Sequence, residues 1–235
     1  MIAKQILFSS RFSEELPHPK PALHHIPSAY KNMQSFYEKN LNRETIKKCV
    51  PFLDALTCGY IIPFASDIQF VYEDGQAKFF FPENMHPDHI AQIGIEYHSP
   101  KQIDDELRYN RRTVDAVFKF INHWNIKTPP GYSCIFTQPF NRNLPFQIID
   151  GIVDTDSYNF QTHFPFYWTQ DSSKTHVLKK GDPMILLIPF KRDDWKMKVA
   201  LNKESYIDES KRKLKFFNVL LDNYKKFFWK KKSYK

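Results

Sequence analysis

Short apolar runs recur along the second half of the chain, and turn-forming residues separate them. The runs are AVFKFINHW, YSCIFTQP, FQIIDGIV, THFPFYW, HVLKK and MILLIPF, and the breaks are TPPGY, NRNLP, DTDSYN and KKGDP. Strands spaced by about ten residues, with Pro, Gly, Asn and Asp between them, are typical of antiparallel sandwiches and barrels. The runs do not alternate with helical patterns, which argues against a doubly wound parallel sheet. We therefore predict a mainly β protein, an antiparallel β-sandwich or barrel.

Three other segments carry clear patterns. DIQFVYEDGQAKFFF predicts strands over 67–73 and 77–82, because Asp-Gly between apolar runs is a hairpin signal. ETIKKCVPFLDALTCGYIIP predicts a short helix that begins at Pro51 and stops at Gly59. The segment 203–232 has no Pro or Gly, and one helical face would collect Leu214, Phe217, Leu221, Tyr224 and Phe228.

These patterns divide the chain into three parts. Residues 1–43 contain LPHPKPALHHIPSAYKNM, whose Pro and His content predicts an extended arm laid over the body. Residues 44–202 form the predicted β-rich core domain. Residues 203–235 form the predicted basic amphipathic helix, packed on the core or appended to it.

The net charge of +8 is concentrated at the end of the chain. Residues 191–235 hold 15 Lys and Arg against 6 Asp and Glu, which leaves 19 against 20 for residues 1–190. A groove that follows nucleic-acid phosphates needs cations across its face, so the core domain gives no strong nucleic-acid signal. The basic helix is expected to pack on the sheet, to mediate self-association or bind a protein partner, or to contact an anionic membrane.

The cysteines and the N-terminal sequence indicate the cellular compartment in which the protein is expected. Cys49, Cys58 and Cys134 form no CxxC pair, which argues against a disulfide framework or a zinc finger and favours a reducing environment. The apolar run in MIAKQILFSSRF is too short for a signal peptide, and no window reaches the ~18 apolar residues of a spanning helix. We expect a soluble, cytoplasmic protein.

Several of the turns and strand ends follow one another in a recognisable order. TPPGY, the P-x-N-R turn of PFNR, GIVDTD and the GDP turn of KKGDP occur in that sequence. In this order they resemble the signature half of a family of uncharacterised bacterial and phage proteins. The resemblance implies a fold more than an activity.

GIVDTDSY and KKGDPMILLIPF are also similar to a strand end and a turn of trimeric dUTPases and dCTP deaminases. This resemblance implies a dUTPase-like fold in which Asp154, with Asp156 beside it, lies where a general base activates water. It implies that Tyr158 lies near the deoxyribose and that Arg142, in TQPFNR, is the nearby cation. Ser157 separates Asp156 from the tyrosine, which turns the tyrosine to the face opposite that of the family's residue. TQPFNR stands where those enzymes carry an Arg-Ser-Gly phosphate loop.

A structural interpretation of the same residues is open beside the chemical one. Asp side chains hydrogen-bond their own backbone in turns, so DTDS is also ordinary turn chemistry, and we favour that interpretation. Trp168, with Trp124 and Trp195, offers a ring for stacking on a ligand, but aromatic residues at strand spacing more often belong to the core. Cys134, in YSCIF, is expected to be a small buried side chain.

A metal site is a further hypothesis. His86 and Asp88 in NMHPDHI form the H-x-D pattern of iron and 2-oxoglutarate oxygenases, with His163 or His176 as the third ligand and Arg192 beyond them. A solvated loop is the competing interpretation, since the pattern is short and the chain holds 9 His. The sequence identifies no cofactor.

The enzyme motifs are all incomplete, and neither G-x-S-x-G nor a phosphate loop occurs in the sequence. We therefore predict a non-catalytic binding or assembly module of phage or bacterial type. One alternative is a dUTPase-like protein that binds or hydrolyses nucleotides with Asp154. The other is an iron oxygenase that uses His86 and Asp88, so whether the protein is an enzyme is left open.

Overall fold

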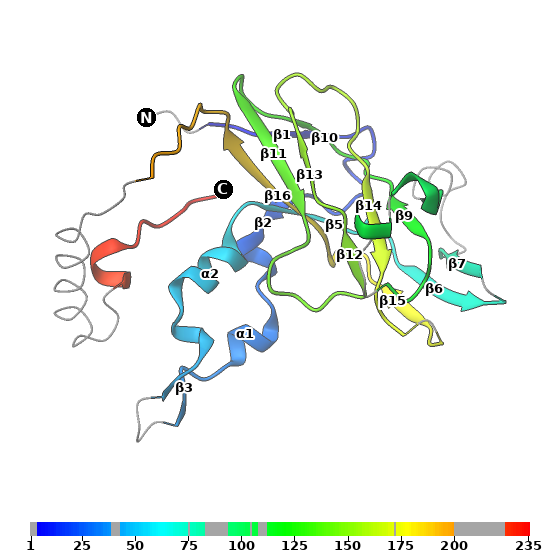
Figure 1. Ribbon diagram of the computed structural model, residues 1–235, viewed down its shortest axis with the longest axis horizontal. Coiled ribbons are helices and arrows are strands. Elements are labelled where there is room, and N and C mark those ends of the chain that lie inside the picture. The colour runs from blue at the N-terminus through cyan, green and yellow to red at the C-terminus, as the bar shows by residue number, and fades with distance from the viewer. Residues whose placement is uncertain are drawn as a thin grey trace. The chain divides into compact units, whose positions relative to one another are not determined.

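A computed structural model describes residues 4–38, 43–74, 76–82, 94–103, 105–107, 112–171, 173–199 and 224–235 (Figure 1). The fold class predicted from strand spacing is confirmed, since the described residues are mainly β and their strand pairs are antiparallel. The chain forms two compact units. Unit 1 comprises Met1–His25, Thr57–Arg192 and Tyr234–Lys235, and unit 2 comprises Ile26–Leu56 and Asp193–Ser233.

Unit 1 holds most of the strands. They are β1 (Leu7–Ser9), β2 (Lys20–Pro21), β5 (Tyr60–Pro63), β6 (Ile68–Glu73), β7 (Gln76–Phe80), β8 (Ile95–His98), β9 (Val117–Phe120), β10 (Asn125–Lys127), β11 (Tyr132–Thr137), β12 (Phe146–Ile148), β13 (Gly151–Val153), β14 (Phe164–Trp168), β15 (His176–Leu178) and β16 (Pro183–Lys191). Its short 3-10 helices are η1 (Ala22–His25), η4 (Pro100–Gln102) and η5 (Asp105–Leu107).

Unit 2 is built from shorter elements. They are α1 (Ser28–Asn32), β3 (Phe36–Glu38), β4 (Arg43–Glu44), the 3-10 helix η3 (Ile46–Lys48), α2 (Val50–Thr57, whose last residue belongs to unit 1) and the π-helical turn η6 (Tyr224–Phe228). β3 and β4 pair with one another. Within this unit the Trp229 indole N–H donates to the Asp54 carboxylate, at 3.0 and 3.1 Å from its two oxygens.

The described strands of unit 1 form several sheets (Figure 1). The largest has the order β13-β11-β16-β5-β2, a second has the order β12-β14-β9-β8, and a third has the order β15-β6-β7. β1 pairs with β10. The predicted run FQIIDGIV therefore divides at Asp150 into two strands that belong to different sheets, because β12 pairs with β14 and β13 pairs with β11.

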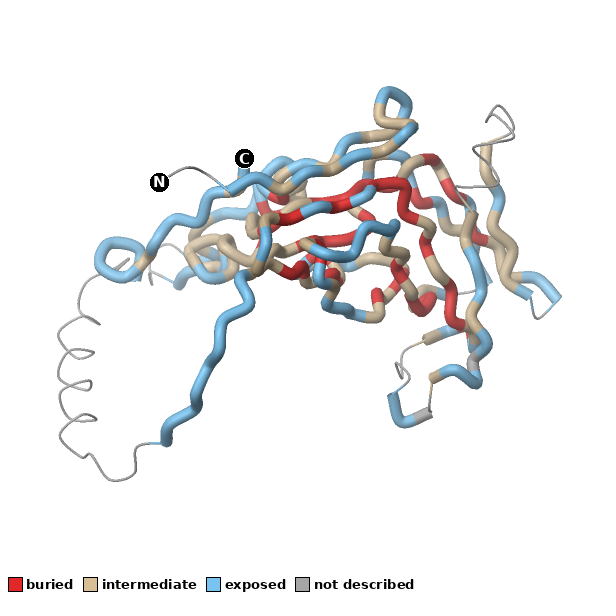
Figure 2. Tube along the Cα trace, turned by 90° about the horizontal axis from the view of Figure 1, so that it is seen from above, coloured by how far each residue is buried: buried red, intermediate tan, exposed pale blue. Residues whose placement is uncertain are grey.

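Phenylalanine dominates the core that these sheets share, which Figure 2 colours red. Phe136 of β11 stacks on Phe164 of β14 with ring centroids 5.5 Å apart, and this contact joins the two larger sheets. Phe120 and Phe166, from neighbouring strands, stack at 3.8 Å. Aromatic pairs at these separations add to the free energy gained by burying their area. The two larger sheets therefore pack as in a β-sandwich.

The local predictions are confirmed where the structure describes the residues. The predicted hairpin is β6 and β7, and Asp74 at the turn has a φ of 53°, which Asp tolerates better than most residues. α2 matches the predicted helix, and Gly59 follows it with a φ of 73°. A Cβ at position 59 would lie 2.3 Å from the Leu187 carbonyl oxygen, so only glycine fits.

The two ends of the chain were predicted as an arm and a helix. β1 and β2 pair with β10 and β5, so residues 7–21 add two short edge strands to unit 1. α1 and β3, which follow, lie in unit 2. Most of the predicted helix 203–232 lies outside the described residues, which resume at 224. Among the helices that the structure describes, none has the length and hydropathy needed to cross a membrane.

Candidate functional site

The predicted aspartates lie in a turn that leaves β13, which we call the aspartate turn (residues 154–158). Cys134 is paired with Val153 in the β11–β13 ladder, so the turn begins beside Ser133 at the start of β11. The Ser157 and Tyr158 N–H groups both donate to the Asp154 carbonyl oxygen, at 3.0 and 2.8 Å. The backbone of DTDSY therefore closes on itself as a hydrogen-bonded turn.

Arg192 joins the two aspartates. It follows β16, which pairs with β11, and its guanidinium donates to Asp154 Oδ1 at 3.1 Å and to Asp156 Oδ1 at 3.0 Å. A second guanidinium N–H donates to Asp156 Oδ2, which makes that pair bidentate. Ser133 Oγ completes the group, because it accepts from Arg192 at 2.9 Å and donates to Asp154 Oδ1 at 2.6 Å.

Asp156 also holds the TPPGY turn. Its Oδ2 accepts the Gly131 N–H at 2.8 Å, and Gly131 has the left-handed φ of 81° that this turn requires. The Arg192 guanidinium, and after it the Gly131 N–H, lower the pKa of Asp156 from 3.8 to about 2. Only 9% of the Asp156 side chain is exposed, whereas 62% of the Asp154 side chain is. Asp156 is therefore a carboxylate at neutral pH, and it links the ends of three strands.

Thr155, between the two aspartates, points inward. It is buried, and its hydroxyl lies 2.8 Å from that of Thr128 and donates to Cys134 Sγ at 3.3 Å. Burial raises the pKa of the Cys134 thiol to about 11. Cys134 is buried, as its place in an apolar strand predicted.

Arg142 lies on a different loop, between β11 and β12, which we call the arginine loop (residues 138–145). Gln138 fixes the loop, because its side-chain amide donates to the Phe146 carbonyl and accepts from the Ile148 N–H, each at 3.0 Å. Asn141 takes a left-handed φ of 55°, a conformation that Asn adopts more readily than most residues. The Asn of the P-x-N-R turn thus sets the direction in which Arg142 leaves the loop.

The structure does not bring Arg142 and Asp154 together. The aspartate turn lies at the Tyr132 end of β11, and the arginine loop begins after Thr137 at the other end. β11 is six residues long, which at ~3.3 Å per residue separates its ends by roughly 16 Å. The two halves of the site implied by the dUTPase resemblance therefore lie at opposite ends of one strand.

The other predicted ligand-binding side chains also lie apart. Tyr158 is 42% exposed and contacts the Phe160 ring edge-on at 5.5 Å. Trp168 is fully buried, where it stacks on Phe70 with ring centroids 3.9 Å apart. Trp168 is therefore a core residue with no face open to a ligand.

The predicted metal ligands are only partly within the described residues. His86 and Asp88 lie outside them. His176 Nε2 donates to the Asp171 carbonyl oxygen at 2.8 Å, and its ring contacts Trp168 edge-on. Within the described residues, no group of three or more His, Cys, Asp and Glu side chains is arranged to hold a metal ion.

Two residues in these arrangements were not among the predicted site residues. Arg192 is 36 positions from its main partner Asp156, and only the antiparallel register of β11 and β16 brings them together. His25 of η1 lies near Arg142, whose charge lowers the pKa of His25 after the larger effect of burial. Nothing in HHIP signals that proximity.

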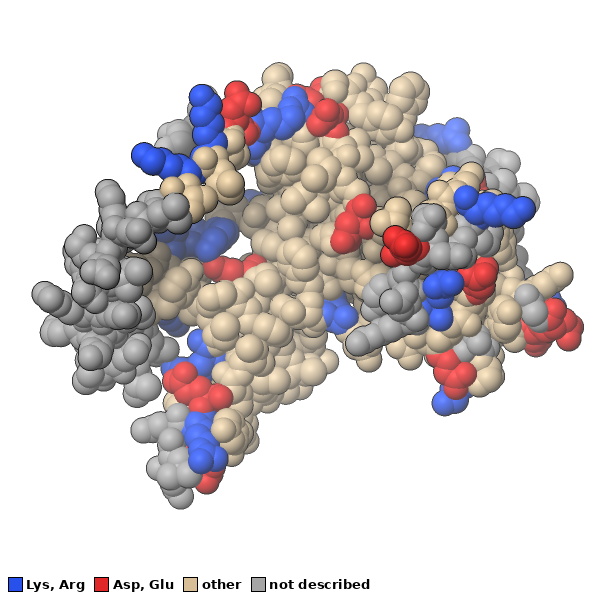
Figure 3. Space-filling view, viewed as in Figure 1, with Lys and Arg blue, Asp and Glu red and all other residues tan. Residues whose placement is uncertain are grey.

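On the face that Figure 3 shows, Lys and Arg side chains are scattered rather than gathered in one stripe.

Comparison with known proteins gives only distant similarities. No protein family model and no characterised protein sequence matches the chain. Among solved structures, it is similar to a mutant dUTPase of Staphylococcus bacteriophage 80alpha determined with dUpNHpp, at 10% identity and a TM-score of 0.39. It is also similar to a mutant dUTPase from phage phi11 of S. aureus, at 10% identity and a TM-score of 0.35. Each similarity covers 85% of this chain and 99% of the other. Similarities of this strength do not assign an activity.

Proposed function

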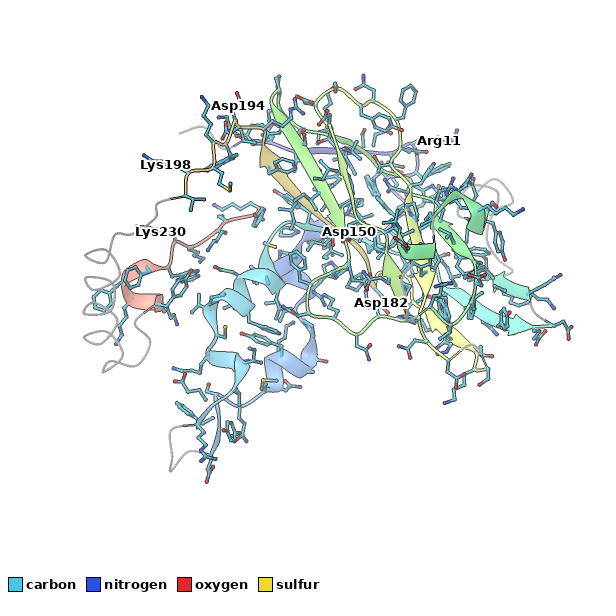
Figure 4. The ribbon with its side chains drawn as sticks, in the orientation of Figure 1. Arg11, Asp150, Asp182, Asp194, Lys198 and Lys230 are labelled. Carbon is cyan, nitrogen blue, oxygen red and sulfur yellow. The ribbon has the colours of Figure 1, made fainter. Side chains whose placement is uncertain are left out.

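We propose that the protein is a non-catalytic assembly module that joins copies of itself through the extended segment 193–199. In this segment Trp195 and Met197 are 90% and 91% exposed, and Val199 is 66% exposed. Two lysines alternate with them, so apolar and cationic side chains occupy opposite faces of an extended chain. Figure 2 colours the segment as exposed throughout, and Figure 4 labels Lys198 within it.

The exposure of Trp195 and Met197 carries the proposal. Large apolar side chains in a row, exposed to this extent, are unfavourable in water and typical of surfaces that another chain covers. An extended segment with alternating apolar residues matches the edge of a β-sheet, to which it adds as a further strand. The chain itself offers such an edge, because β13 ends the largest sheet and its Ile152 is 66% exposed. A second copy is therefore the partner we propose.

The aspartate turn supports a non-catalytic function. A general base must be free to take a proton from water. Both oxygens of Asp156 are bound by Arg192 and Gly131, so Asp156 is not free in this sense, and Asp154 shares Arg192 and Ser133 with it through its Oδ1 atom. This network gives the two carboxylates a structural purpose.

The oligomeric state tests the proposal. Light scattering of the wild-type protein should give a mass above that of one chain, and the double variant Trp195→Ser/Met197→Ser should be a monomer. The matched control Lys196→Ser/Lys198→Ser changes the other face of the same segment and should keep the oligomer. A strict monomer at high concentration would overturn the proposal, as would a monomer that binds anionic vesicles through this segment. Turnover of dUTP or dCTP that Asp154→Asn abolishes would refute the non-catalytic part.

A further inference from the structure

The arginine loop holds a cation whose hydrogen bonding is incomplete. Arg142 is half-buried, and its Nε atom is buried without a hydrogen-bond partner among the described residues. Burial lowers the pKa of Arg142. A buried donor without a partner costs free energy, and buried charges in proteins are normally paired. Arg142 therefore lacks, within the described fold, the partner that its chemistry requires.

Two hollows adjoin Arg142, and the lining of the smaller one is mainly polar. One hollow of about 220 Å³ is lined by Gln138, Arg142, Asn143, Leu144, Phe146, Gln147, Thr169 and Gln170. A second hollow of about 440 Å³, lined by Thr137–Asn143, shares three of these residues. Neither set of lining residues includes a carboxylate, so the charge of Arg142 is not balanced there. Amide and hydroxyl groups surround it instead, and these are able to bind further oxygen atoms of a ligand.

His25, His24 and Lys20 also lie near the same loop. Besides burial, the charges of Arg142, Lys20 and His24 lower the pKa of His25, in that order, so these groups are close enough to repel a proton from it. The His25 Nε2 atom is also buried without a partner among the described residues. All these neighbours belong to unit 1. Lys20 adds a second positive charge on this side of unit 1, whereas His25, whose pKa is lowered, is neutral at neutral pH and offers a ring nitrogen for hydrogen bonding.

From this geometry we infer that the hollow at Arg142 is a binding site for a small oxyanion of the phosphate class. A guanidinium presents parallel N–H groups that match the oxygens of phosphate, and a neutral amide lining supplies hydrogen bonds without repelling the anion. The smaller hollow has room for a single phosphate group, and the adjoining one opens to the remainder of a larger phosphorylated molecule. The lining of the site includes no residue of segment 193–199, so the inference does not depend on the proposed assembly function.

Titration calorimetry with inorganic phosphate tests the site in the full-length protein. Wild-type protein should bind phosphate, and Arg142→Gln should weaken binding by about tenfold or more, because it removes a charged hydrogen-bond donor. Arg11, labelled in Figure 4, serves as the matched control, because it lies over the Phe12 ring 4.7 Å from its centroid and lines neither hollow. Arg11→Gln should bind phosphate as the wild type does.

A second variant keeps the test decisive if Arg142→Gln folds poorly. Gln147→Glu places a carboxylate of the same size in the lining, where it would pair with Arg142. It should abolish phosphate binding while the melting temperature stays at or above the wild-type value. A nucleoside monophosphate that binds more tightly than phosphate would assign the site to a phosphorylated metabolite, and equal binding would assign it to the free ion. Absence of phosphate binding in the wild type, or equal binding in Arg142→Gln, would overturn the inference, as would acetate binding as tightly as phosphate.

Discussion

The two ends of β11 each carry an arginine, one exposed and one half-buried, and the fold pairs only the exposed one. At one end Arg192 is bound by Asp154, Asp156 and Ser133, so its charge is balanced by two carboxylates of the fold itself. At the other end Arg142 is more deeply buried, yet no carboxylate lines the hollows around it. Charges that the fold itself pairs are structural. The unbalanced charge is the one that points to a ligand.

The largest effect is expected from Asp156→Ala. The variant removes the acceptor of the Gly131 N–H and the bidentate partner of Arg192, so the TPPGY turn and the end of β16 lose their common anchor. We expect thermal unfolding to shift down by several degrees. Asp150, labelled in Figure 4, is an exposed aspartate between β12 and β13 and is the matched control. If Asp150→Ala lowered the melting temperature equally, the contrast between the two ends would be wrong.

Acid should weaken the aspartate turn selectively. The pKa of Asp156 is about 2 in the folded chain and near 3.8 when unperturbed, so folding favours the carboxylate. Its contribution to the free energy of unfolding is therefore complete above about pH 4 and is lost as the pH falls through about 2. Urea midpoints measured across this window should fall less steeply for Asp156→Asn than for the wild type. Parallel pH profiles would show that the ion pair does not contribute.

The smallest expected effect comes from replacing one threonine near each end of β11. Thr155 is buried, and its hydroxyl lies 2.8 Å from the Thr128 hydroxyl and 3.3 Å from Cys134 Sγ, whereas Thr169 lines the hollow at Arg142. Thr155→Val should lower the free energy of unfolding by about 1–2 kcal/mol, because it leaves buried polar groups unpaired. Thr169→Val should change it by less than about 0.5 kcal/mol. Urea unfolding of both variants measures the difference.

The sequence predicted the fold because its signals are local. Each turn motif lies between two runs that form strands, and the Asp74-Gly75 hairpin and the short helix before Gly59 depend on a few neighbouring residues. FQIIDGIV was read as a single run because nothing in its hydrophobicity marks the point at which it changes sheets. That change at Asp150 depends on packing between distant strands.

The candidate site was harder to predict because its partners are distant in sequence. Arg142 was grouped with Asp154 through the dUTPase resemblance, but β11 and β13 run antiparallel and carry the two residues to opposite ends. Arg192 reaches the aspartates only through the register of β11 with β16, which no short motif encodes. The turn interpretation of DTDS depended on backbone chemistry alone, and the backbone hydrogen bonds to Asp154 follow that pattern.

The buried thiol of Cys134 allows local opening of the sandwich to be measured. Its thiol lies under Thr155 in the sheet core, and its pKa of about 11 leaves little reactive thiolate at neutral pH. A thiol reagent can therefore modify it only during the moments when β11 and β13 separate. In a chain whose other cysteines, Cys49 and Cys58, are replaced by serine, the rate of labelling would report how often this part of the sandwich opens.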